Sequence, residues 1–233
     1  MIDIDKIIGE QLLSENDGER RKRQVGEYYC TDLGYCSRKT WYKYKDIDLE
    51  EADETERIRM LKIFERGNLL HEWVTERLRK YASDNGGFLK DEVSIAMPNL
   101  KDHFIVRGRI DNLIQWSDHY EIIEVKTTAR IKKRGMPMYH HVAQVMPYLM
   151  YAPNAKASIL YLEPATLKME SYPIHYDMFE MEELWKKASR IHHDIQFDIL
   201  PDAEAKLNKE MNWECKNCSL SSCQLGLEMA KVI

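Results

Sequence analysis

The sequence predicts a single domain of the mixed α/β class, on three observations. Helix-like and strand-like hydrophobic periodicities follow one another in the order helices, three strands, helix, two strands and helix. No linker rich in Pro, Gly or Ser separates them, so residues 1–233 are assigned to one domain. Apolar residues make up 44% of the chain and aromatic residues 10%, which supports a sizeable core and excludes wholesale disorder.

Two helical segments are expected near the N-terminus. Residues 1–27 are amphipathic and then highly charged, which predicts a helix followed by a solvated turn. Thr31 or Asp32 can cap a short helix that runs to about Tyr44. The acidic run over residues 46–56 predicts a solvated connection.

A long amphipathic helix is predicted over Arg57–Tyr81, where apolar residues recur at three- and four-residue steps. The glycines of Asn85-Gly86-Gly87 end it. The remaining patterns predict strands over 88–97, 103–115 and 120–127, a helix over 138–152 that Pro147 should kink, strands over 158–163 and 169–175, and a final helix over 178–197.

Two carboxylates are expected to face each other across the second strand pair. A hairpin symmetric about Ser117 and Asp118 places Asp111 directly opposite Glu124, with Cβ atoms roughly 5 Å apart, and Lys126 on the same face. Opposed carboxylates repel, so either Mg²⁺ or Mn²⁺ lies between them or they form an exposed polar ladder with the lysine. The apolar neighbours and the poor strand propensity of Asp favour the metal site.

Two residue pairs have helical spacing. Gly67 and His71 are four residues apart on the long helix and share a face. A glycine inside a helix costs about 1 kcal/mol relative to alanine and often marks the close approach of another element. His71 is then either a neutral imidazole ligand of the same metal or a structural histidine. Gln144 and Tyr148 have the same spacing, which alone indicates nothing.

The C-terminal cysteines have the spacing of metal ligands. Cys215, Cys218 and Cys223 form C-x2-C-x4-C, and Cys30 or Cys36 is available as a fourth thiolate. Zinc and an iron–sulfur cluster both fit four thiolates. The first residues lack the layout of a secretory signal, which predicts a cytoplasmic, reducing location where thiols are favoured over disulfides.

The charge balance limits the mode of nucleic-acid binding. A net charge of −5 argues against histone-like coating of nucleic acid and leaves room for a local basic groove. Aromatic residues Trp41, Tyr42 and Tyr44 alternate with lysines and either stack on unpaired bases or pack in the core. Basic residues are dense over 20–23, 38–45 and 126–134, and the last segment includes candidate phosphate contacts at Arg130, Lys132, Lys133 and Arg134.

In combination these patterns resemble the RecB-like branch of the PD-(D/E)xK nucleases, and within it the CRISPR-associated exonucleases that carry an iron–sulfur cluster. Each matching motif is weak by itself, whereas all of them in order are specific. The motifs are Gly67 to His71, Gly108 to Asp111, Glu124-x-Lys126 followed by Thr127, Gln144 to Tyr148, and the segment 31–39, in which Ser37 stands where the family usually has proline.

The resemblance implies a restriction-endonuclease-like core, a central mixed sheet flanked by helices, with a cysteine-ligated cluster that joins segments near 28–45 and 211–226. It implies a DNA exonuclease that acts on single strands or frayed ends, in CRISPR spacer acquisition with the spacer-integration complex. The cluster would be 4Fe–4S rather than 2Fe–2S, with zinc as the alternative. The implied site residues are His71, Asp111, Glu124 and the Val125 carbonyl for Mg²⁺ or Mn²⁺, Lys126, Gln144 and Tyr148 for catalysis, and Cys36, Cys215, Cys218 and Cys223 for the cluster.

The same sequence patterns also fit a second function. A nuclease-like fold can serve as a non-catalytic module that binds DNA ends or acts as an adaptor in an integration or repair complex. Such a module would bind DNA in EDTA and show no degradation stimulated by metal. The complete set of candidate catalytic residues favours the enzyme.

Overall fold

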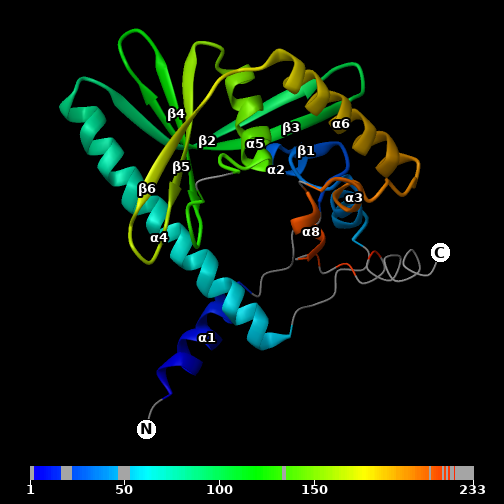
Figure 1. The fold of residues 1–233 in the computed structure, drawn as a ribbon, viewed down its shortest axis with the longest axis horizontal. Helices are drawn as coiled ribbons and strands as arrows, with labels where there is room; N and C mark the ends of the chain where they lie inside the picture. Colours follow the sequence, from blue (N-terminus) through cyan, green and yellow to red (C-terminus); the bar gives the residue numbers. More distant parts are fainter. Residues whose placement is uncertain are drawn as a thin grey trace.

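A mixed six-stranded sheet forms the centre of the computed structural model, which describes residues 3–16, 23–46, 53–132, 135–209, 211–216, 218, 220 and 223. The strands follow the order β1-β3-β4-β5-β6, and β2 pairs with β3 (Figure 1). The strands are β1 (Glu27–Tyr29), β2 (Phe88–Asn99), β3 (Phe104–Gln115), β4 (Tyr120–Thr127), β5 (Ala155–Leu162) and β6 (Met169–Ile174).

Strand β3 connects the two halves of the sheet. Along one edge it pairs antiparallel with β2 over its whole length, except at Asp111. Along its other edge, residues 105–107 pair with β1 in parallel and residues 112–115 pair with β4 antiparallel. Residues 108–111 therefore lie between two strands without a strand partner of their own on that edge, within the part of the chain that the structure describes. We call these four residues the β3 gap.

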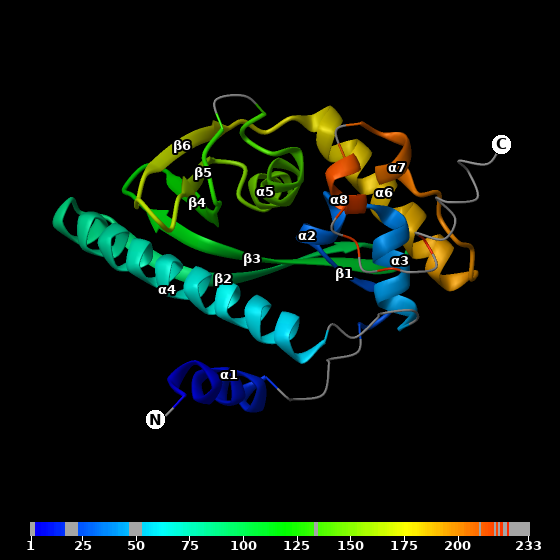
Figure 2. The same ribbon diagram turned by 60° about the horizontal axis from the view of Figure 1, so that its bottom comes forward.

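Helices cover both faces of the sheet (Figure 2). The long helix α4 packs on one face, over a core that includes Val74, Val125 and Leu162. Helices α5 and α6 lie on the opposite face, over the largest core cluster. The helices are α1 (Ile4–Glu15), α2 (Cys30–Leu33), α3 (Ser37–Lys45), α4 (Glu54–Asp84), α5 (Tyr139–Tyr151), α6 (Met178–Gln196), α7 (Glu204–Leu207) and α8 (Asn212–Lys216).

The mixed α/β class, the long helix and the five strands read from the sequence are confirmed. Their bounds shift by a few residues, and α5 runs continuously through the buried Pro147. Among the helices that the structure describes, none is both long and apolar enough to cross a membrane. The sequence missed β1, because three residues carry no periodicity and this strand exists only through its pairing with β3.

Two predictions about the N-terminal third are wrong. The helix expected up to Tyr44 is two helices, α2 and α3, separated at residues 34–36. Thr31 and Asp32 do not begin it; they lie inside α2, where the Asp32 carboxylate accepts the Tyr29 N–H at 3.2 Å.

The acidic connection is shorter than expected. Of the segment 46–56, residues 47–52 lie outside the described residues. The Asp53 carboxylate caps α4 by accepting the Glu56 N–H, so the helix already begins at Glu54. Likewise, α1 ends at Glu15, well before the end of the segment expected to carry the first helix and its turn.

The contact between α2 and α5 depends on the absence of a side chain at Gly34. A Cβ atom there would lie 2.6 Å from the His140 Cα and 2.7 Å from the His140 carbonyl oxygen, and backbone atoms cannot move aside cheaply. Gly67 in α4 has room for a side chain, because the nearest atom to a Cβ placed there would be the Thr127 Oγ1 at 3.9 Å. The close approach that its sequence position suggested is therefore absent among the described residues.

We expect Gly34→Ala to lower the free energy of unfolding by about 1–3 kcal/mol through this overlap. Gly67→Ala, as the matched control, should raise it by up to about 1 kcal/mol through helix propensity alone. Urea unfolding followed by circular dichroism measures both. Equal effects from the two substitutions would contradict the packing described here.

Candidate active site

The predicted register of the β3–β4 hairpin is confirmed. Asn112 pairs with Ile123 and Gln115 with Tyr120, so the same register places Asp111 across from Glu124. The strand ladder itself stops before that pair. The Val125 N–H donates to the Asp111 Oδ2 at 2.8 Å, so a side chain takes the place of the backbone partner at the β3 gap.

Pairing along the β2 edge of β3 is also distorted at Asp111. Register is regular on either side of Glu92, which lies across from Asp111, but Glu92 itself has a φ of 53°. A left-handed conformation costs a non-glycine residue roughly 1–2 kcal/mol. Asp111 therefore occupies a point where regular pairing is broken on both edges of its strand.

Glu124 is the most buried charged group of the site, with none of its surface exposed. Its Oε1 accepts hydrogen bonds from the Lys126 Nζ and from the Gln144 Nε2, both at 2.6 Å. Its Oε2 is buried and has no hydrogen-bond partner among the described residues. Burial raises the pKa of Glu124 to about 7; the charge of Asp111 adds to this rise, and Lys126 opposes it.

The Lys126 ammonium contacts Glu124, and 19% of the Lys126 side chain is exposed. Burial alone would lower its pKa, but the charges of Glu124 and Asp111 outweigh burial and raise the pKa above its usual value. The amine is therefore held as an ammonium ion that donates to Glu124.

Tyr148 fills the β3 gap from α5. Its hydroxyl donates to the Arg109 carbonyl at 3.0 Å and accepts from the Gln144 amide at 3.1 Å. Gly108 makes room for it, because a Cβ there would lie 2.6 Å from the Tyr148 Cε1 and 2.7 Å from the Cys30 Sγ. The unpaired edge of β3 is thus completed by side chains from α5.

His71 approaches the same point from α4. Its Nδ1 lies 3.6 Å from the Asp111 Oδ2, and a third of the side chain is exposed. Burial, together with the charge of Lys126, lowers the pKa of His71, while Asp111 opposes this. The imidazole is therefore neutral near pH 7, which is the form that binds metals.

These residues fit a divalent cation, although no three His, Cys, Asp or Glu side chains in the described part of the chain already form a complete metal-binding group. The unpartnered Oε2 of Glu124, the Asp111 carboxylate and the neutral His71 are ligands that Mg²⁺ or Mn²⁺ accepts. The Val125 N–H points toward β3, and its carbonyl shares that edge because both groups of a strand residue face the same neighbour.

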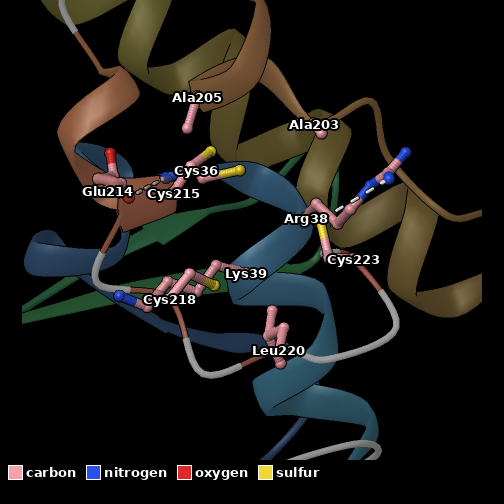
Figure 3. Close-up of a pocket in the computed structure, with 10 residues that line it drawn as sticks. All are labelled: Cys36, Arg38, Lys39, Ala203, Ala205, Glu214, Cys215, Cys218, Leu220 and Cys223. Carbon is pink, nitrogen blue, oxygen red and sulfur yellow. Dashed lines mark hydrogen bonds between the residues drawn. The ribbon is translucent and has the colours of Figure 1, made fainter. Parts of the chain in front are cut away.

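A second candidate site lies beside α3 and α8, where one pocket is lined by all four predicted cluster ligands: Cys36, Cys215, Cys218 and Cys223 (Figure 3). Burial raises the pKa of the Cys215 and Cys218 thiols, and the neighbouring cysteines add to this rise. Cys30 is elsewhere, packed against Gly108. The structure thus places Cys36, and not Cys30, with the three C-terminal cysteines.

The cysteine pocket brings the two ends of the sequence together. The Cys36 N–H donates to the Glu214 carboxylate at 3.1 Å. Ser37 donates both its N–H and its hydroxyl to the Glu204 Oε1, at 2.7 and 2.9 Å. Proline, which the resembling family usually has at this position, could make neither bond. The departure from the family pattern therefore adds two contacts between α3 and α7.

The residues predicted to contact DNA differ in their exposure. Arg130 and Lys132 follow β4 and are exposed, whereas Lys133 and Arg134 lie outside the described residues. Of the two alternatives for Tyr42 and Tyr44, the structure supports packing in the core, because both are buried. The Tyr44 hydroxyl donates to the Glu27 carbonyl at 2.6 Å, inside the molecule.

The basic residues of the other two dense segments are largely engaged in structure. Arg23 and Lys43 lie 3.5 and 3.7 Å from the buried Asp32 carboxylate, and Lys45 pairs with Asp198 at 2.8 Å. Residues 20–22 lie outside the described part of the chain. Arg23, Lys43 and Lys45 are therefore engaged in ion pairs within the molecule.

Two aromatic residues near the site were not singled out from the sequence. Tyr35 and Trp213 lie close to His140, and the charge of Lys126 acts on Tyr35 and His140. Tyr35 lies within the segment that carries Cys36, and Trp213 lies two residues before Cys215. Their closeness to the predicted cysteine ligands was the available signal.

The chain is similar to known nucleases. The family model of the PD-(D/E)XK nuclease superfamily matches residues 39–223. A CRISPR-associated exonuclease Cas4 of Saccharolobus solfataricus is 24% identical over 203 residues, which cover 85% of this chain and 87% of the relative. The crystal structure of SSO0001 covers 94% of both chains with 22% identity and a TM-score of 0.64, which supports the fold. An alkaline exonuclease, LHK-Exo from Laribacter hongkongensis, has a TM-score of 0.49 and 13% identity and covers 82% of this chain and 94% of its own.

Removing one member of the buried Glu124–Lys126 pair should cost far more than removing both. We expect Lys126→Met to lower the free energy of unfolding by about 3–5 kcal/mol, because it leaves a buried carboxylate without its cation. The double variant with Glu124→Gln should recover most of this loss. Lys90→Met, on the exposed surface of β2, should change stability by less than about 0.5 kcal/mol. Additive effects in a denaturant double-mutant cycle would show that the two side chains are not coupled.

Proposed function

Since this chain belongs to the PD-(D/E)XK nuclease superfamily, we propose that it is a DNA exonuclease that depends on Mg²⁺ or Mn²⁺ and acts on single strands or frayed ends. The observation that carries the proposal is the convergence of Asp111, Glu124 and Lys126 at the β3 gap, with one carboxylate oxygen unpartnered. The name of the 24% identical relative, an exonuclease, supports the direction of the proposal.

Asp111, Glu124, His71 and the Val125 carbonyl would hold the cation. A divalent ion bound there supplies Lewis-acid polarisation of the phosphoryl oxygens and lowers the pKa of a coordinated water. Two carboxyl groups and a neutral imidazole match the oxygen-rich, negatively charged ligand set of such an ion.

The other residues orient the carboxylates and stabilise charge. Lys126 and Gln144 both donate to the Oε1 of Glu124, which fixes the carboxylate and leaves Oε2 available. The Lys126 ammonium also presents positive charge to the non-bridging oxygens of a phosphodiester, whose negative charge increases during attack by water. Tyr148 is a positioning residue, because it holds Gln144 and the Arg109 carbonyl in place without reaching the carboxylates.

We expect Asp111→Asn and Lys126→Ala each to reduce the rate of DNA cleavage at least hundred-fold, an order of magnitude typical of lost charge stabilisation or proton-transfer groups. The assay uses single-stranded DNA labelled at either end, in Mn²⁺ or Mg²⁺, with EDTA abolishing cleavage. Label position also gives the polarity of degradation.

Asp118→Asn is the matched control for this experiment, because Asp118 belongs to the same hairpin and its side chain is 80% exposed. Its activity should equal that of the parent protein. Cleavage by both site variants at the parent rate would overturn the proposal. DNA binding that persists in EDTA without any cleavage by the parent would instead favour a non-catalytic DNA-end-binding module.

We also propose that the four cysteines hold a structural iron–sulfur cluster, of the 4Fe–4S rather than the 2Fe–2S type. The support is their common pocket, in which burial and the neighbouring cysteines raise the pKa of Cys215 and Cys218. A bound cation would stabilise the thiolates there. Arg38, whose Nη1 lies 3.9 Å from the Cys223 Sγ, would donate to a ligating sulfur.

Anaerobically purified protein should be brown and lose its visible absorbance in Cys215→Ser, because a cluster with three protein ligands is labile. Cys30→Ser is the matched control and should retain the colour, since Cys30 packs against Gly108 outside the pocket. Iron, sulfide and zinc contents measure the outcome. A colourless protein with stoichiometric zinc would replace the cluster by a zinc site and leave the nuclease proposal intact.

The biological setting that we propose is CRISPR spacer acquisition, in which this exonuclease would trim DNA ends for the integration complex. The printed name of the Saccharolobus solfataricus relative, a CRISPR-associated exonuclease, supports this setting.

A further inference from the structure

Three rings form a cluster in which two members lie close to predicted cysteine ligands in the sequence. The ring centroids of Tyr35 and His140 are 5.1 Å apart, those of His140 and Trp213 are 4.8 Å apart, and those of Tyr35 and Trp213 are 6.3 Å apart. The rings come from three segments: the turn between α2 and α3, the first turn of α5, and α8. We call this cluster the aromatic platform.

Exposure distinguishes the aromatic platform from the core. His140 is buried, Tyr35 is half-buried, and Trp213 is 41% exposed. By contrast, Trp41, Tyr42 and Tyr44, the aromatic residues of neighbouring α3, are all buried. A large indole held at the surface against two further rings offers an accessible face for stacking.

Two lysines lie near the aromatic platform. The Lys39 Nζ is 5.4 Å from the centroid of the Tyr35 ring. The charge of Lys126, in the carboxylate site, acts on two of the rings. Burial raises the pKa of Tyr35 and Lys126 opposes this rise, whereas burial and Lys126 both lower the pKa of His140. A chain of phosphates that passes Lys126 and Lys39 would therefore run along the same rings.

The backbone holds the exposed indole in place. Glu214, next to Trp213, accepts the Cys36 N–H, and Tyr35 precedes that cysteine. The Tyr35 carbonyl accepts a hydrogen bond from the Lys187 ammonium at 2.7 Å. Both outer rings are thus fixed by the contacts that join the N- and C-terminal segments.

From this arrangement we propose that the aromatic platform stacks one unpaired nucleobase of the strand whose phosphate would lie at the cation held by Asp111 and Glu124. The proposal rests on the nuclease function and adds to it the structural basis of a preference for single strands or frayed ends. Base–aromatic stacking tolerates every base, because each has a π-face, whereas a paired base is already stacked inside a duplex. The platform therefore selects unpaired DNA without reading its sequence.

The test measures binding of oligothymidylates, each with one abasic nucleotide at a different position, to the non-cleaving variant Asp111→Asn. We expect one position, or two adjacent ones, at which the missing base weakens binding roughly ten-fold or more. Adding Trp213→Ala should flatten this profile, because the base would no longer have a ring to stack on. Trp213→Phe should restore part of it.

Tyr81→Ala serves as the matched control, because Tyr81 is 58% exposed and lies at the end of α4 remote from α8 (Figure 1). Its abasic profile should equal that of the Asp111→Asn parent. Tyr35→Leu gives a second route to the same loss if Trp213→Ala fails to fold, as judged by circular dichroism.

Failures of the two proposals are distinguishable. A position-dependent loss that survives both platform substitutions, or a flat profile in the parent, would overturn the platform while cleavage data on the nuclease proposal still stand. An Asp111→Asn protein that binds none of the oligonucleotides, and a parent that cleaves none, would overturn both.

Discussion

The interruption of pairing along one edge of β3 is the constraint on which the candidate site depends. β1 and β4 share this edge, and the residues between them must satisfy their polar groups by other means. Tyr148 supplies a hydroxyl to the Arg109 carbonyl, and the Asp111 carboxylate supplies an acceptor to the Val125 N–H. A gap in a sheet is thereby converted into a place where side chains, and not backbone groups, converge.

Electrostatics at this gap favours a bound cation. Two carboxyl groups share one ammonium ion, and burial disfavours a positive charge on His71. Because Lys126 and Gln144 donate to the same oxygen of Glu124, the second oxygen is left buried and unpartnered. An unpartnered buried acceptor is costly, and a divalent ion is a group that can satisfy it without disturbing the donors already present.

The parts of the site that follow from local sequence were predictable, and those that depend on distant contacts were not. The register that places Asp111 across from Glu124 follows from a short turn between adjacent strands, and it is confirmed. Gln144 and Tyr148 meant nothing from their spacing, because their role arises only when α5 packs over the β3 gap. Stacking was one of two alternatives for Tyr42 and Tyr44, because aromatic and basic residues alternate there, but α3 is covered on the side that carries them.

The contacts between the two ends of the chain explain why a ligand at the cysteines would matter to the whole fold. Cys36 and Cys215 enclose most of the sequence, and closing so long a loop costs conformational entropy that the hydrogen bonds of Glu214 and Glu204 must offset. Each such bond contributes only about 1 kcal/mol net, so a few of them are a weak tether. Shared thiolate ligation would be a far stronger one. Because Trp213 and Tyr35 lie close to those cysteines in the sequence, thiolate ligation would also hold the aromatic platform in place.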